Sequence, residues 1–132
     1  FKGDVPMHVL MVDDETEFLE IMKKRLGRRS MDITTASNGM DGLKCVQAMT
    51  DGTGPKFDVV VMDVRMPGMD GLETLGEMKK IAPKLPVILL TGHASVGVAV
   101  RGMENGAYDY LLKPVSLNEL IIKMDEAVRA EK

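Results

Sequence analysis

This sequence has one cysteine, no long apolar run and no large excess of charge of either sign. A single cysteine, Cys45, excludes an internal disulfide, and its apolar neighbours suit a small buried hydrophobe in a reducing compartment. No run approaches the ~20 apolar residues that a membrane helix needs, and Phe1 to Pro6 lack the apolar core of a signal peptide. A formal net charge of -3 gives no reason to expect nucleic acid or a membrane as a direct partner. We therefore expect a cytoplasmic protein.

The size and composition predict one folded domain. The chain has 132 residues, of which 45% are hydrophobic and 28% are charged, close to the averages of globular proteins. We expect residues 1–132 to form a single domain with a core from about residue 6 to residue 130. Whether the sequence is part of a longer regulator or stands alone is left open.

Short apolar runs alternate with segments of helical period along the whole chain, which is typical of an α/β protein with a parallel sheet. Three of the runs are almost unbroken, as expected of central strands that helices cover on both faces. The strand candidates are Met7 to Val12, Asp32 to Ala36, Asp58 to Met62, Pro86 to Leu90 and Tyr108 to Leu112.

Helix starts are indicated by a capping residue three positions before a glutamate. This pattern occurs at Asp14 with Glu17, at Asp70 with Glu73 and at Ser116 with Glu119. The last helix has an apolar stripe that should face the sheet. The stripe consists of Leu117, Leu120, Ile121, Met124 and Val128.

Two other segments have glycines that affect their expected structure. The helix expected over Ser95 to Asn105 contains Gly97 and Gly102, each of which costs about 1 kcal/mol relative to alanine, so we expect it to be the least rigid. The glycine-containing stretch Thr50 to Lys56 is the most linker-like.

Four of the apolar runs end at a group that is capable of phosphate or metal chemistry. These groups are Asp13 with Asp14, Asp63, Thr91 and Lys113. Taken singly, each has a plain structural explanation as a helix cap, a turn residue or a solvated surface amine. Because the carboxyl ends of parallel strands share one edge of a sheet, where open α/β sheets bind their ligands, the four together predict a single pocket.

The sequence around these positions resembles the receiver domains of two-component response regulators over nearly the whole chain. The runs that carry the resemblance are Val12 to Glu15, Met62 to Gly71, Leu90 to Ala94 and Tyr110 to Pro114. The resemblance implies a flavodoxin-like fold of the CheY-like superfamily, a doubly wound five-stranded parallel sheet in the order 2-1-3-4-5 with helices on both faces. The stretches Thr91 to His93 and Gly106 to Tyr110 look most like receivers of enhancer-binding transcriptional activators.

The resemblance also implies a phosphoacceptor chemistry. Asp63 would accept a phosphoryl group from a phosphohistidine of a sensor histidine kinase. Lys113 would neutralise charge on the transferring group, and the Thr91 hydroxyl, expected to be uncommitted, would donate to a phosphoryl oxygen. Such a domain is regulatory rather than an enzyme, with self-catalysed phosphotransfer and autodephosphorylation only.

Three carboxylates in one crevice repel one another and need a cation, and hard oxygen ligands suit Mg²⁺. By resemblance, Asp14 and Asp63 would ligate it directly and Asp13 through water. The backbone carbonyl of Arg65 would complete the protein ligands.

Further positions are implied by the same resemblance. The Lys113–Pro114 peptide bond is expected to be cis, although the base rate for X-Pro bonds favours trans. Tyr110 matches the family's switch aromatic. His93 and Arg65 are expected to line the site and tune hydrolysis of the phosphoaspartate, in a direction that the residues do not indicate.

The output surface is expected on three elements, Ser95 to Asn105, Tyr108 to Leu112 and Ser116 to Ala130, with Val98 and Ile122 as exposed apolar contacts. It would bind an output domain, a partner protein or, after phosphorylation, a second copy. The cognate kinase and signal are not indicated.

Three other classes fit less well. A haloacid dehalogenase-type phosphohydrolase has a second Asp two residues after its nucleophile, where this chain has Arg65. A flavodoxin-like nucleotide or flavin binder would have a glycine-rich phosphate loop after the first strand, where Asp13 and Asp14 stand. A degenerate receiver that serves only as a docking module would not need the residues for phosphorylation, and this chain has all of them.

Overall fold

The computed structural model describes residues 7–130, so the Phe1 to Pro6 and Glu131 to Lys132 ends lie outside the described residues. The described chain forms one parallel sheet in the order β2-β1-β3-β4-β5. The order 2-1-3-4-5 is therefore confirmed. The strands are β1 His8–Val12, β2 Asp32–Ala36, β3 Val59–Asp63, β4 Val87–Thr91 and β5 Asp109–Leu112.

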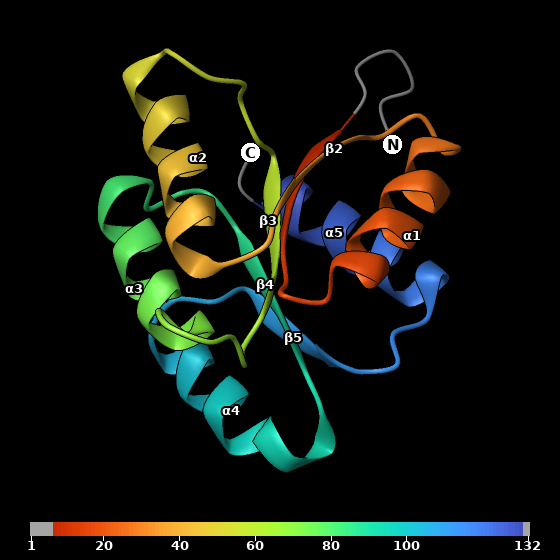
Figure 1. Cartoon of the computed structure of the whole chain (residues 1–132), viewed down its shortest axis with the longest axis vertical. Helices are drawn as coiled ribbons and strands as arrows, with labels where there is room; N and C mark the ends of the chain where they lie inside the picture. The colour runs from red at the N-terminus through yellow and green to blue at the C-terminus, as the bar shows by residue number, and fades with distance from the viewer. Residues whose placement is uncertain (1–6, 131–132) are drawn as a thin grey trace.

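Helices cover both faces of this sheet. Figure 1 shows α2, α3 and α4 on one side, and α1 and α5 on the other. The helices are α1 Thr16–Gly27, α2 Gly39–Asp51, α3 Gly71–Ile81, α4 Val96–Glu104 and α5 Leu117–Ala130, with a 3-10 turn His93–Ser95 before α4.

Alternate side chains of the central strands supply two separate cores. In β3, Val60 and Met62 pack towards α2, α3 and α4, whereas Val59 and Val61 pack towards α1 and α5. All five residues of β3 and of β4 are buried. Burial on both faces explains why these strands are almost continuous apolar runs.

Two of the three predicted helix caps are confirmed, and one is wrong. The Asp70 carboxylate accepts a hydrogen bond from the amide of Glu73 at 2.8 Å, and the Ser116 hydroxyl accepts from Glu119 at 3.3 Å. At α1 the capping position is occupied by Glu15, whose side chain makes no cap hydrogen bond. Asp14 instead lies among the acids at the edge of the sheet.

Two other predictions need correction. Helix α2 continues through Asp51, into the stretch expected to be a linker. Val98 was expected to be exposed, but it is half-buried against the core on the α2, α3 and α4 side. The exposed valine of α4 is Val100, at 45%, whereas Ile122 on α5 is exposed at 59% as predicted.

The loop after β3 depends on two glycines. Gly68 has a φ of 78°, which an L side chain rarely adopts, and it makes the turn after Pro67. At Gly71 an added Cβ would lie 2.5 Å from the backbone oxygen of Asp63. Glycine at this position therefore lets α3 start directly against the end of β3.

Candidate functional site

The carboxyl edge of the sheet brings together the side chains that the sequence singled out. Asp13 follows β1, Asp63 ends β3, Thr91 ends β4 and Lys113 follows β5. Asp13, Asp63 and Thr91 are all buried, with 1%, 7% and 0% of their surface exposed. Burial of two carboxylates at one edge is costly unless cations neutralise them.

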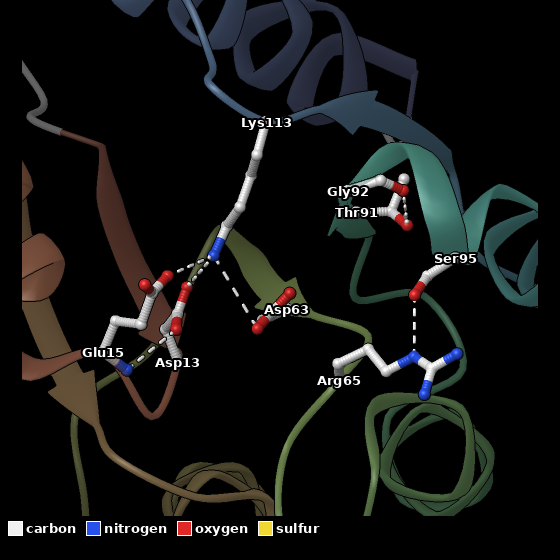
Figure 2. A network of polar contacts seen from close by, with 8 residues as sticks. All are labelled: Asp13, Glu15, Asp63, Arg65, Thr91, Gly92, Ser95 and Lys113. Carbon is white, nitrogen blue, oxygen red and sulfur yellow. Dashed lines mark hydrogen bonds and ion pairs between the residues drawn. The ribbon is translucent and has the colours of Figure 1, made fainter.

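Lys113 is the cation at the centre of this group, and its ammonium contacts three carboxylates (Figure 2). The Nζ atom lies 2.9 Å from an oxygen of Asp13, 2.9 Å from Glu15 and 3.7 Å from Asp63. It also lies 4.9 Å from the centroid of the Phe18 ring, within cation–π range. The contacts with Glu15 and Phe18 were not predicted. The only sequence signal for Glu15 is its place directly after the two aspartates.

The ionisation of Asp63 and Lys113 reflects this crowding. Burial raises the pKa of Asp63 to about 6, and repulsion from Asp13 adds to the shift, although Lys113 and a hydrogen bond from the Arg65 backbone amide oppose it. Burial would lower the pKa of Lys113, but its hydrogen bonds to Glu15 and Asp13 outweigh burial and raise the pKa above its usual value. Lys113 therefore stays protonated. The negative charge of Asp63 is only partly offset by Lys113, because burial and Asp13 both disfavour it.

The three aspartates fit a hard divalent cation. Asp13, Asp14 and Asp63 each offer a carboxylate oxygen, and these oxygens lie within 4.8 Å of one another. Lys113 contacts Asp13 and Asp63, but no salt bridge joins it to Asp14. Since all the side-chain donors are carboxylates, they suit Mg²⁺ rather than a softer metal.

A second group of contacts lies beside the first, between the β3–α3 loop and the start of α4 (Figure 2). The Thr91 hydroxyl donates to the carbonyl oxygen of Gly92 at 3.0 Å, so the prediction that it is uncommitted is wrong. The Arg65 Nε donates to the Ser95 hydroxyl at 2.7 Å. Ser95 is buried, and its role was not predicted because serine four residues after Thr91 carries no distinctive signal.

The other predicted positions lie around these two groups. The Lys113–Pro114 peptide bond is cis, as the resemblance implied. Tyr110 is half-buried and packs against the core on the α4 side. His93 is exposed in the 3-10 turn, and its side chain makes no hydrogen bond or ion pair to another residue within the described range 7–130. Its predicted role as a residue lining the site stays a prediction.

Three aspartates, a lysine and a threonine lie together at the carboxyl edge of a doubly wound α/β sheet, which is the arrangement that the resemblance implied. Residues 9–125 match the model of the response regulator receiver domain. The chain therefore belongs to the family of response regulator receiver domains, which are regulatory domains and not classical enzymes.

Among curated proteins, the chain is similar to transcriptional regulators. It is 35% identical over 123 residues to the transcriptional regulatory protein GlrR of Escherichia coli K12, covering 93% of this chain and 26% of that protein. It is 35% identical over 120 residues to the DNA-binding transcriptional regulator NtrC of the same organism, covering 91% and 24%. The chain thus spans about a quarter of the length of these relatives.

Solved structures show the same similarity. A response regulator receiver domain protein from Clostridium thermocellum superimposes with a TM-score of 0.85 at 35% identity, covering 95% of this chain and 96% of that one. The receiver domain of NtrX from Brucella abortus superimposes with a TM-score of 0.79 at 32% identity, covering 92% and 98%. Within residues 7–130, none of the helices has the length and apolar character needed to cross a bilayer.

Proposed function

We propose that Asp63 accepts a phosphoryl group from a phosphohistidine of a sensor histidine kinase, with Mg²⁺ bound at the adjacent acids. The observation that carries this proposal is the position of Asp63, which ends β3 within 3.7 Å of Lys113 and in one cluster with Asp13 and Asp14. We further propose that residues 1–132 are one receiver domain.

In the transfer, a carboxylate oxygen of Asp63 attacks phosphorus. The new P–O bond forms as the P–N bond to the donor imidazole breaks, and the imidazole leaves with the electron pair of that bond. Asp13 and Glu15 hold the Lys113 ammonium beside Asp63, from where it can neutralise negative charge on the phosphoryl oxygens.

Mg²⁺ would be held directly by Asp14 and Asp63, by Asp13 through water and by the backbone carbonyl of Arg65. When bound, it supplies positive charge that offsets the three carboxylates and the incoming phosphoryl group.

Intact-mass measurement after incubation with Mg²⁺ and acetyl phosphate tests the assignment. The chain should gain the mass of one phosphoryl group, and Asp63→Asn should gain none. Asp58→Asn is a suitable control. Asp58 is exposed at the opposite end of β3, where its carboxylate accepts a hydrogen bond from the His8 amide, far from the carboxyl edge of the sheet. Full labelling of Asp63→Asn would remove Asp63 as the acceptor.

We also propose that the α4–β5–α5 face is the output surface, which contacts an output domain, a partner protein or a second copy. Thr91 would move to donate to the phosphoryl group, Tyr110 would turn into the space that it leaves, and α4 would shift. The exposed apolar side chains Val100 and Ile122 are the candidate contacts, in place of Val98.

Amide exchange with and without beryllofluoride, a phosphoryl mimic, tests this surface. We expect changes between residues 91 and 105 and in β5. Changes confined to residues 40–56 would place the switch elsewhere.

A further inference from the structure

The Arg65 side chain links the loop that follows Asp63 to the residue that precedes α4. Its Nε donates to the Ser95 hydroxyl at 2.7 Å, although the two residues are 30 positions apart. Figure 2 shows the Arg65 guanidinium directed towards Ser95, while the Asp63 carboxylate lies on the side of Lys113. The hydrogen bond therefore joins two segments that β3 and β4 bring to the same edge.

Ser95 occupies the N-cap position of α4, but it does not cap the helix. Its side chain makes no hydrogen bond to a backbone amide of α4, whereas Asn38 and Asp70 cap α2 and α3 through theirs. Ser95 is 6% exposed, so its hydroxyl has little access to water and depends on protein partners. Arg65 is the partner that it has, and the start of α4 is held by a side chain from outside the helix.

Arg65 is also a cation without a counterion. None of the salt bridges within residues 7–130 includes it, and its side chain is exposed. It lies two residues after Asp63, where phosphorylation would add a charge of about -1.5 to -2 and three strong acceptor oxygens. A hydrogen bond between a guanidinium and a phosphoryl group is stronger than one to a neutral hydroxyl.

We propose that Arg65 is a positioning residue that holds the start of α4 through Ser95, and that a phosphoryl group on Asp63 competes for its guanidinium and releases Ser95. This inference rests on the proposed phosphorylation of Asp63 and deepens it. Once released, the Ser95 hydroxyl is free to accept a hydrogen bond from the first turn of α4. The Arg65–Ser95 contact thus opposes the shift of α4 before phosphorylation, and its loss favours the shift afterwards.

A double-mutant cycle tests this competition, with Arg65→Lys, Ser95→Ala and the double variant. Lysine keeps the charge but lacks the Nε–H that bonds Ser95. Before phosphorylation, each single change should raise amide exchange of residues 96–102 by roughly fivefold, the net effect of one hydrogen bond. The double variant should exchange no faster than the single ones, because both changes remove the same contact.

With Mg²⁺ and beryllofluoride present, the coupling between the two positions should disappear. Ser95→Ala and Arg65→Lys should also lower the half-saturating beryllofluoride concentration, because the contact that opposes the active state is gone. Arg65→Ala should need a higher concentration than Arg65→Lys, because it also loses the charge. The control is Ser116→Ala, which removes a capping hydroxyl from α5 and should leave exchange of α4 unchanged.

The outcomes separate this inference from the proposed function. Additive effects of the two changes before phosphorylation would show that the Arg65–Ser95 contact does not hold α4, and equal coupling with and without beryllofluoride would show that the contact persists in both states. Either result would overturn the inference. A parent chain that gains no phosphoryl mass would instead contradict the phosphoacceptor function itself.

Discussion

The two halves of the site are held by different forces. Around Lys113, one cation is bound by Asp13, Glu15 and Asp63, so that half depends on charge. Around Thr91 and Ser95, the contacts are single hydrogen bonds from one hydroxyl and one guanidinium. The charged half can bind and neutralise a phosphoryl group, whereas the hydrogen-bonded half can exchange partners at little cost. The proposed function, in which Asp63 accepts a phosphoryl group and α4 shifts in response, needs these two properties side by side.

The largest expected effect on stability comes from removing the central cation. Lys113→Met should lower the free energy of unfolding by about 2 kcal/mol at pH 8 without Mg²⁺, because it leaves the buried Asp13 and the crowded Asp63 without their counterion. The measurement is urea unfolding.

Lys123→Met is the matched control for that change. Lys123 pairs with Asp109 at 2.8 Å, but both side chains are more exposed, at 24% and 32%. We expect this control to lose less than about 1 kcal/mol. Equal losses in the two variants would show that the charged half is no more than an ordinary surface cluster.

A second change should stabilise the domain, with a defined pH dependence. The pKa of Asp63 is raised to about 6 from 3.8, so the folded chain retains a proton that the unfolded chain releases. This contribution to stability is complete below pH ~4 and is lost as the pH rises through about 6. Asp63→Asn should therefore raise the free energy of unfolding on the order of 2 kcal/mol at pH 7 and leave it unchanged at pH 3.5.

Unfolding of Asp63→Asn and of the parent at the two pH values checks this prediction. Addition of Mg²⁺ should stabilise the parent and narrow the difference at pH 7. A gain of the same size at both pH values would mean that the stabilisation does not come from the charge of Asp63.

The third prediction concerns the affinity of the acidic cluster for Mg²⁺, on which we expect a smaller effect than the two changes in stability above. Asp14→Ala removes a carboxylate and a formal charge from the cluster, so Mg²⁺ affinity should fall about tenfold or more. Mg²⁺ titration by calorimetry gives the affinity, with Glu17→Ala as a control, since Glu17 lies nearby on α1 but outside the cluster. If both variants lose affinity equally, Mg²⁺ is attracted by the general negative charge of this edge.

The smallest effect on stability is expected in the hydrogen-bonded half. Thr91→Val should change the free energy of unfolding by less than about 1 kcal/mol, because the hydroxyl that it removes makes one local bond to the Gly92 carbonyl. The same change should abolish the exchange response of residues 92–105 to beryllofluoride.

Thr74→Val serves as the control, because Thr74 is also buried and bonds a local carbonyl, that of Asp70. It should cost similar stability and leave the response intact. A full response in Thr91→Val would show that α4 is moved by another group, with the Arg65–Ser95 contact as the next candidate.

The fold and most of the site chemistry were predictable because they depend on local pattern. Apolar runs such as Val59 to Met62 indicate strands covered on both faces, and a polar residue that directly follows such a run must lie at the edge of the sheet. Together with the resemblance, this pattern indicated Asp13, Asp63, Thr91 and Lys113, and the strand bounds are within one residue of those expected.

Only the tertiary structure decided which of these groups bond to one another. Glu15 and Asp13 both bind Lys113, about 100 positions away, and Ser95 receives its hydrogen bond from Arg65 on another loop. The sequence also did not indicate which of the α4 valines is exposed. Val98 and Val100 are two positions apart, and of these two only Val100 is exposed. Hydrophobic period and strand ends are local properties of the chain, whereas the partner of a charged or hydroxyl side chain depends on distances that exist only after the strands have paired.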